Sequence, residues 1–196
     1  PQIIQWNMAR FAECLLPLID ADEKKAAAIV HPLIQDFSSR FEEKWAEMMG
    51  RKLGLASVEQ EGRRMIDPLL DQLRKRRLDY TVTFHLLTLS LTSTPVAARA
   101  KRELGSWYDL WKKCLTGQNK TVQEVEALMK RNNPVVIPRN HHLETVIREC
   151  EETGEASSAE RFLDVLRSPY EELPQTVRYQ DPPLDEDRDY QTFCGT

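Results

Sequence analysis

Glycine is scarce in this sequence, with seven among 196 residues, and none of the seven falls in a GxGxxG or GxxxxGK pattern. Loops that cradle phosphate need such glycines, because only a backbone without side chains brings several N–H groups close to the anion. The DFG and HRD triplets of kinase-type phosphoryl transfer are missing too. The sequence therefore predicts no nucleotide-binding and no catalytic residue within this chain.

Long apolar runs and an excess of basic charge are also lacking. A membrane-spanning helix needs about 20 consecutive apolar residues, whereas the mean hydropathy here is -0.53. Nucleic-acid binding needs a surplus of Lys and Arg clustered on one face, whereas this chain has a net charge of -4. We expect a soluble chain with no membrane and no nucleic-acid partner, and we interpret the one basic run, Arg74 to Arg77, as a solvated helix face.

The cysteines are few and far apart. Four are present, with no CxxC pair, at positions 14, 114, 150 and 194. The first three lie in helical patterns beside apolar neighbours, so we predict reduced thiols in the core. Cys194 is third from the end of the chain. Two interpretations of it stay open, an exposed thiol that reaches a partner sulfur or an idle terminal cysteine.

Histidine offers no metal site by its spacing. His141 and His142 are adjacent, and neighbours on a helix point about 100° apart, so the two rings cannot grip one ion. His31 and His85 are interpreted as surface or core histidines rather than general bases. We therefore predict no metal ligand in this chain.

Apolar residues recur at helical spacing along residues 1–169, which predicts an all-α fold. Two stripes stand out near the start: one expected helix carries Ile4, Met8, Phe11, Leu15 and Leu18, and the next carries Val30, Leu33, Ile34, Phe37, Phe41, Trp45 and Met48. We expect Pro32 to kink or split the second helix. Trp107 and Trp111, one helical turn apart, are interpreted as core rather than as a ligand platform.

Helix starts are marked by capping residues. Asp20 or Asp22 can cap the second helix, Asp79 can cap a helix from Tyr80, and Asp67 followed by Pro68 predicts another start. Two capping boxes are expected, and they pair Thr121 with Glu124 and Ser157 with Glu160.

The composition changes at Tyr170. Residues 1–169 form the predicted helical domain, and 170–196 form a tail of Pro, Asp, Glu and Tyr in which no apolar period could build a core. The chain opens at Pro1 inside a helical pattern, which suggests a piece of a longer protein.

Several stretches, taken in order, resemble the selenoprotein O family. They are PQIIQWNMAR at 1–10, KLGL at 52–55, DYTVTF at 79–84, Asn133-Pro134 with Arg139-Asn140, Ser168-Pro169-Tyr170, and Cys194 third from the end. The resemblance spans nearly the whole chain. It implies the C-terminal helical half of a protein-kinase-like fold, and a parent enzyme that moves AMP from ATP onto protein hydroxyls.

The resemblance also implies which functions lie elsewhere. The family's ATP and magnesium ligands precede the position equivalent to Pro1, so ATP and Mg are expected only for the full-length parent. Its partners would be the upstream kinase-like part of the same protein and its protein substrates, in a bacterial cytoplasm or a mitochondrion. Cys194 matches a terminal cysteine thought to form a regulatory disulfide with an upstream cysteine.

Three functions are kept for comparison. The first is the helical scaffold of an adenylyltransferase with Cys194 as a redox-regulatory thiol. The second is a non-catalytic interaction module in which the helices of Trp107, Trp111 and Phe162 form a groove, and the third is a redox enzyme that uses Cys194 as nucleophile. Arg139 and Asn140 are predicted to mark a buried ion pair or a domain contact.

Overall fold

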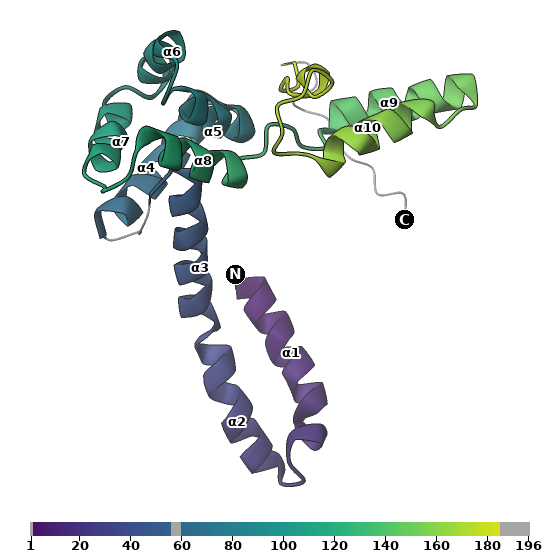
Figure 1. Cartoon of the computed structure of the whole chain (residues 1–196). Coiled ribbons are helices and arrows are strands. Elements are labelled where there is room, and N and C mark those ends of the chain that lie inside the picture. Colours follow the sequence, from purple (N-terminus) through teal and green to yellow (C-terminus); the bar gives the residue numbers. More distant parts are fainter. Residues whose placement is uncertain (1, 56–59, 185–196) are drawn as a thin grey trace. The chain divides into compact units, whose positions relative to one another are not determined.

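The computed structural model describes residues 2–55 and 60–184 (Figure 1). Within these ranges the regular structure is helical and no strand occurs, so the all-α prediction is confirmed. None of the helices in the described ranges is long and apolar enough to cross a membrane. The chain divides into a first unit, residues 1–49, and a second unit, residues 50–196.

The first unit is built on a helical hairpin. Helix α1 (Gln2–Ile19) lies antiparallel beside α2 (Glu23–Gln35), and α3 (Phe37–Lys52) follows (Figure 1). Asp22 caps α2, as predicted, by accepting a hydrogen bond from the Lys24 N–H at 2.9 Å. The predicted split after Pro32 is confirmed, because the helix stops at Gln35 and a new one starts at Phe37.

The apolar stripe of α1 is exposed or half-buried within this chain. Every residue of α1 is described, and none of them is buried. Phe11 is 65% exposed and Leu18 is 82% exposed. Cys14 is exposed as well, so its prediction as a core thiol is wrong. Helical spacing shows that apolar residues share a face, but it does not show that the same chain covers that face.

The second unit contains seven α-helices and a short 3₁₀ helix among its described residues, and α3 ends in it. They are α4 (Gln60–Arg76), α5 (Tyr80–Leu89), α6 (Thr94–Leu104), α7 (Ser106–Thr116), α8 (Val122–Asn132), α9 (Asn140–Thr153), α10 (Ser157–Arg167) and η1 (Val177–Tyr179). Helix α7 packs on α4 and α6, and α5 packs on α6 and α8. Helices α9 and α10 lie side by side (Figure 1).

The tryptophan pair of α7 anchors the core of the second unit, as predicted. Trp107 is 6% exposed and Trp111 is fully buried, and their rings stack with centroids 6.2 Å apart. Each indole N–H is satisfied: Trp107 donates to the Met65 carbonyl and Trp111 to the Leu53 carbonyl, both at 2.9 Å. These bonds tie α7 to α4 and to the turn after α3.

A second apolar cluster lies between α9, α10 and η1. Its buried members are Val136, Val146, Phe162, Val165 and Tyr179, and the half-buried Cys150 packs against them. The prediction that nothing beyond residue 170 contributes to a core is therefore wrong for Tyr179. A single aromatic side chain buries a large area without any sequence period.

Two predicted helix starts are also wrong. Helix α4 begins at Gln60 and runs through Pro68, because Met65 and Ile66 bury apolar side chains in the turn before the proline. The predicted cap, Ser157, is the first residue of α10, and Ala156 before it has no side chain to cap the helix. The hydroxyl of the next residue, Ser158, donates to Glu149 at 2.6 Å. The Thr121–Glu124 capping box is confirmed.

Candidate functional site

Three of the sequence stretches singled out above meet in the second unit, although they are far apart in the chain. Lys52 and Gly54 come from the turn after α3, Asp79 and Tyr80 from the start of α5, and Asn133 from the end of α8. Arg139 occupies the N-cap position of α9, without a side-chain capping bond, beside them. We call Lys52, Asp79, Asn133 and Arg139 the motif cluster.

Asp79 and Arg139 form the strongest contact of the motif cluster. Arg139 Nη1 lies 2.7 Å from Asp79 Oδ2, and Nη2 lies 2.9 Å from Oδ1, which is a two-bond fork. The side chain of Arg139 is only 7% exposed and that of Asp79 is 22% exposed. Asp79 Oδ1 also accepts from the Val82 N–H at 2.8 Å and so caps α5. One carboxylate thus joins two helix starts.

The electrostatics of Asp79 fit this role. Burial by itself would raise the pKa of the Asp79 carboxyl. The bond from Arg139, the Val82 N–H and the positive charge of Arg139 act the other way and together outweigh burial, so the pKa lies below its ordinary value. Asp79 is therefore held as a carboxylate, which suits a structural charge rather than a general base.

Asn133 makes hydrogen bonds between uncharged groups in the motif cluster. It is 2% exposed, and its Nδ2 donates to the Lys52 carbonyl at 2.8 Å and to the Thr88 hydroxyl at 3.2 Å. Lys52 Nζ donates back to the Asn132 carbonyl at 2.9 Å. These bonds fasten the end of α8 to the end of α3 and to α5.

Lys52 lies over aromatic rings within the same cluster. Its Nζ is 5.5 Å from the Tyr80 ring centroid and 5.4 Å from that of Phe84, which is cation–π distance. Burial lowers the pKa of the Lys52 ammonium. The positive charge therefore lies between π faces and the Asn132 carbonyl oxygen.

Gly54 lets the turn after α3 approach α8 closely. Its φ is +74°, in the left-handed region, and a β-carbon there would lie 2.6 Å from Val125 Cγ1 and 3.0 Å from Met129 Sδ. Only glycine meets both conditions without strain.

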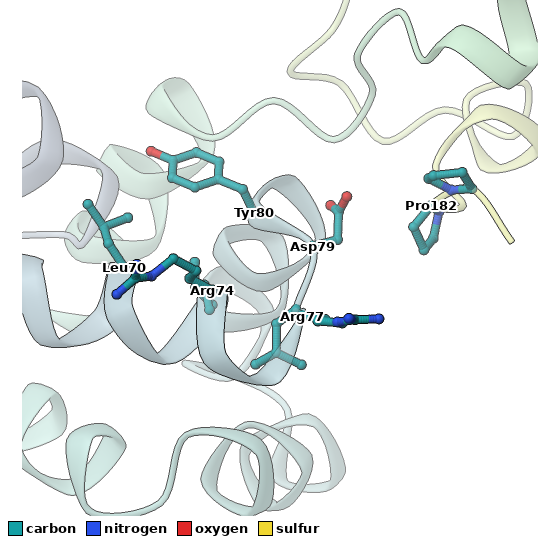
Figure 2. Close-up of a pocket in the computed structure, with 9 residues that line it drawn as sticks. Leu70, Arg74, Arg77, Asp79, Tyr80 and Pro182 are labelled. Atoms are coloured by element: carbon teal, nitrogen blue, oxygen red, sulfur yellow. The ribbon is translucent and has the colours of Figure 1, made fainter. Parts of the chain in front are cut away.

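An open hollow of about 550 Å³ lies beside Asp79 (Figure 2). One wall is the end of α4 with the turn after it, and the opposite wall is Pro182 and Pro183 of the C-terminal segment. Asp79 lies on the hollow, but both of its oxygens are occupied by Arg139. The other charged groups on the hollow are Arg74, which pairs with Asp71 at 2.9 Å, and Arg77.

A buried histidine nitrogen lies near η1. Within the described residues, Nε2 of His142 is buried and has no hydrogen-bond partner. Its ring meets Tyr179 edge-on, with centroids 5.3 Å apart. Burial, helped by the positive charge of Arg139 and by His141, lowers the pKa of His142. The neutral ring therefore packs against Tyr179 of η1.

The residues proposed from sequence have different surroundings. Arg139 is buried in the ion pair, whereas Asn140, the first residue of α9, is exposed. Cys194 lies outside the described residues. Asp79 was predicted only as a cap and within its motif, and Lys52 and Asn133 only within theirs. The signal available for their joint role was that these stretches belong to one family pattern.

The polar atoms of the motif cluster are engaged with one another. No group of three His, Cys, Asp or Glu that could hold a metal ion occurs in residues 2–55 and 60–184. Asp79, Asn133 and Arg139 use their polar atoms to join helix ends. The described contacts of the motif cluster join the ends of α3 and α8 and the starts of α5 and α9.

Comparison with known proteins identifies the family. Residues 1–167 match the family model described as protein adenylyltransferase SelO. The chain belongs to the SelO family, which confirms the resemblance seen in the sequence.

The relatives are longer than this chain. A protein of Teredinibacter turnerae named protein nucleotidyltransferase YdiU is 44% identical over 196 residues, which is 100% of this chain and 40% of that protein. Proteins of the same name from Anoxybacillus flavithermus and Brevibacillus brevis are 40% and 39% identical, with the same coverage. The chain thus spans about 40% of the length of these relatives.

Proposed function

We propose that this chain is the helical scaffold of a protein adenylyltransferase that transfers AMP from ATP to Ser, Thr or Tyr hydroxyls of other proteins. The observation that carries the proposal is the SelO family match over residues 1–167. The names of the relatives support the same reaction class. The scaffold forms no part of the chemistry by itself and acts by holding the rest of the enzyme in place.

Among residues 2–55 and 60–184, no cluster of side chains offers a site for ATP with magnesium. The sequence has no glycine-rich phosphate loop. Within the described residues, no group of three His, Cys, Asp or Glu could hold a metal ion. We therefore assign ATP and Mg to the part of the full-length protein outside this chain. No step of the transfer is assigned to a residue of the motif cluster.

The exposed apolar surface of the first unit supports a scaffold role. Ile3, Trp6 and Phe11 of α1 are 77%, 62% and 65% exposed. Leu33 of α2 is 58% exposed. A single helix with this much exposed apolar surface is typical of an interface. We propose that α1 and α2 dock on the kinase-like part of the same protein. That contact would bury the apolar side chains that are exposed in this chain.

The regulatory role of Cys194 remains part of the proposal. Its support is the family match of the sequence pattern, and its position lies outside the described residues. A redox enzyme that uses Cys194 as nucleophile would need a base beside the thiol.

An interaction module without catalysis is the alternative. Its groove of Trp107, Trp111 and Phe162 loses support, because these side chains are 6%, 0% and 3% exposed and fill the two cores. The exposed face of α1 would serve such a module equally well, so an activity measurement must separate the two functions.

The test is transfer of label from ATP carrying a radioactive α-phosphate. Full-length protein with Mg and a mixture of proteins should acquire covalent label, and this chain alone should not. Full-length protein that transfers no label, yet captures a stoichiometric protein partner, would reject the enzyme and favour the interaction module.

A further inference from the structure

A smaller pocket lies in the second unit, apart from the hollow beside Asp79. It is formed by α5, by the end of α8 and by residues 170–172, which follow α10. Its volume is about 150 Å³. Cavities of about this size hold ligands as large as benzene, which has about six non-hydrogen atoms. The pocket therefore suits a small molecule rather than a nucleotide.

The most buried residues of the pocket are polar. Thr88 and Asn133 line it, and each is only 2% exposed. The Thr88 hydroxyl donates to the Phe84 carbonyl, and the Asn133 amide donates to the Lys52 carbonyl and to the Thr88 hydroxyl. Their donors are in use, whereas each oxygen keeps a lone pair. Asn133 Oδ1 has only a long contact, 3.4 Å from Lys52 Nζ. The floor of the pocket can thus accept hydrogen bonds but has none left to donate.

The edge of the pocket carries a carboxylate. The side chain of Glu172 is 51% exposed, and its Oε1 lies 3.4 Å from Nε2 of His85, which is charged only when protonated. The other oxygen, Oε2, makes no ion pair with residues 2–55 or 60–184. Lys130 also lines the pocket, but its charge is matched by Glu126 at 2.8 Å. The charge that a ligand would meet is therefore negative.

We propose that this pocket binds a small primary amine in its protonated form. The ammonium group donates to Asn133 Oδ1 and to the Thr88 hydroxyl oxygen, and the Glu172 carboxylate supplies the opposite charge. An ammonium group has N–H donors and no acceptor, so it complements a floor that only accepts. Tyr170 also lines the pocket and adds an aromatic ring, a group that attracts cations.

The same chemistry disfavours other occupants. An anion would meet lone pairs at the floor and a carboxylate at the edge, and burying these groups without donors costs free energy. A quaternary ammonium ion carries the charge but has no N–H to donate. The proposal concerns residues of this chain alone, so it holds whether or not the whole protein transfers AMP.

The experiment titrates the ¹⁵N-labelled 196-residue chain with ethylamine hydrochloride at neutral pH and constant ionic strength. Backbone amide signals of residues 85–89, 130–135 and 170–172 report on the pocket. Two probes serve as matched controls: acetate is similar in size but negative, and tetraethylammonium is positive but has no N–H. Alanine, which is ethylamine with an added carboxylate, is a further probe.

Two variants isolate the role of the carboxylate. Glu172→Gln removes the charge from the edge of the pocket. Glu171→Gln is the matched control, because it makes the same change at the neighbouring residue, which does not line the pocket. Both residues are exposed, so neither substitution endangers the fold.

We expect ethylamine to shift the pocket signals saturably with a Kd in about the millimolar range, because so few atoms cannot bind tightly. Glu172→Gln should raise that Kd at least about threefold, which is reasonable for a half-exposed charge. Glu171→Gln should leave it unchanged.

Alanine identifies the source of the amine. Binding tighter than that of ethylamine supports a free amino acid whose carboxylate meets Lys130, and weaker binding supports a simple amine. The proposal is overturned if acetate or tetraethylammonium saturates the same signals as strongly as ethylamine. It is equally overturned if Glu172→Gln binds like the parent, if Glu171→Gln weakens binding as much, or if neither amine gives a saturable shift.

Discussion

Asp79 contributes to two contacts at once, whereas Arg139 contributes to one. The carboxylate caps α5 through the Val82 N–H and also pairs with Arg139, whose side chain is only 7% exposed. Loss of Asp79 therefore removes a helix cap and leaves a buried guanidinium without its counter-charge. Loss of Arg139 leaves a partly exposed carboxylate that still caps α5.

This asymmetry predicts unequal costs. Asp79→Ala should lower the free energy of unfolding by about 3–5 kcal/mol, a figure that includes the lost cap. Removing one partner of a buried ion pair costs about this much. Arg139→Met should cost clearly less, and the double variant should be more stable than Asp79→Ala alone. Urea unfolding of the chain measures all three.

The control for these variants is an exposed pair. Asp164 and Arg167 are 70% and 67% exposed and lie 2.8 Å apart, so Asp164→Ala should cost no more than about 1 kcal/mol. An Asp79→Ala variant as stable as Asp164→Ala would contradict the structural role of the motif cluster.

His142 predicts a pH dependence of stability. Its pKa is lowered in the folded chain, so near the ordinary histidine pKa of about 6.5 the unfolded chain binds a proton that the folded chain does not. Stability should therefore fall as the pH drops below about 6.5. His142→Leu should flatten this slope between about pH 7 and pH 5, as measured by urea midpoints. Equal slopes in both proteins would show that the half-buried ring plays no such part.

Individual residues differed in how well the sequence foretold them. Trp107 and Trp111 were predicted as core because aromatic residues one helical turn apart usually share a buried face. The partner of Arg139 was not predicted, since Asp79 lies 60 positions away and only the fold brings the two together. Cys14 was misplaced because apolar neighbours along a helix do not reveal which face is covered.

At the scale of elements, the turn at Gly54 controls how closely α3 and α8 approach. Gly54→Ala adds a β-carbon that meets Val125 Cγ1 at 2.6 Å in a left-handed backbone. We expect a loss of about 2–5 kcal/mol in stability, from about 1–2 for the backbone and about 1–3 for overpacking. Thermal unfolding of the chain measures it.

Gly154 provides the matched control for this substitution. Its φ is +68°, close to that of Gly54, but nothing lies within 4 Å of an added β-carbon. Gly154→Ala should therefore cost only the backbone share, about 1–2 kcal/mol. Equal losses in the two variants would mean that the close approach of α8 to Gly54 contributes nothing.

Helix boundaries were predictable where a local hydrogen bond sets them. The Asp22 and Asp79 caps and the Thr121–Glu124 box depend on residues within one turn of each other. The start predicted at Pro68 failed because tertiary burial of the preceding turn outweighed the missing proline N–H. Ser157 failed because Ala156 holds the cap position.

At the scale of the whole molecule, the proposed docking of α1 can be tested at its exposed apolar residues. Phe11→Asp should cost the isolated chain less than about 1 kcal/mol, because this side chain is already 65% exposed. The same change in the full-length protein should cost about 2–4 kcal/mol if the ring is buried there. Thermal unfolding of both forms measures the difference.

Asn7→Asp, at an exposed polar site of the same helix, is the control and should be tolerated in both forms. Equal tolerance of Phe11→Asp in both forms would contradict docking of α1 on the remainder of the protein.

Family membership was the part of the whole-molecule account that the sequence made clear. Short motifs in a fixed order identified the SelO family, and the family model confirms it over residues 1–167. The division at residue 49 was not foreseen, because helical periodicity continues across it. Which surfaces stay open could not be inferred either, since helical spacing does not show what covers an apolar face.

The central claim is that this chain supports a nucleotide site that it does not contain. Calorimetric titration with ATP and Mg tests this most directly when the isolated chain and the full-length protein are compared under the same conditions. We predict saturable heat from the full-length protein and none from the chain alone. Saturable, one-to-one binding of ATP by the isolated 196 residues would contradict the account.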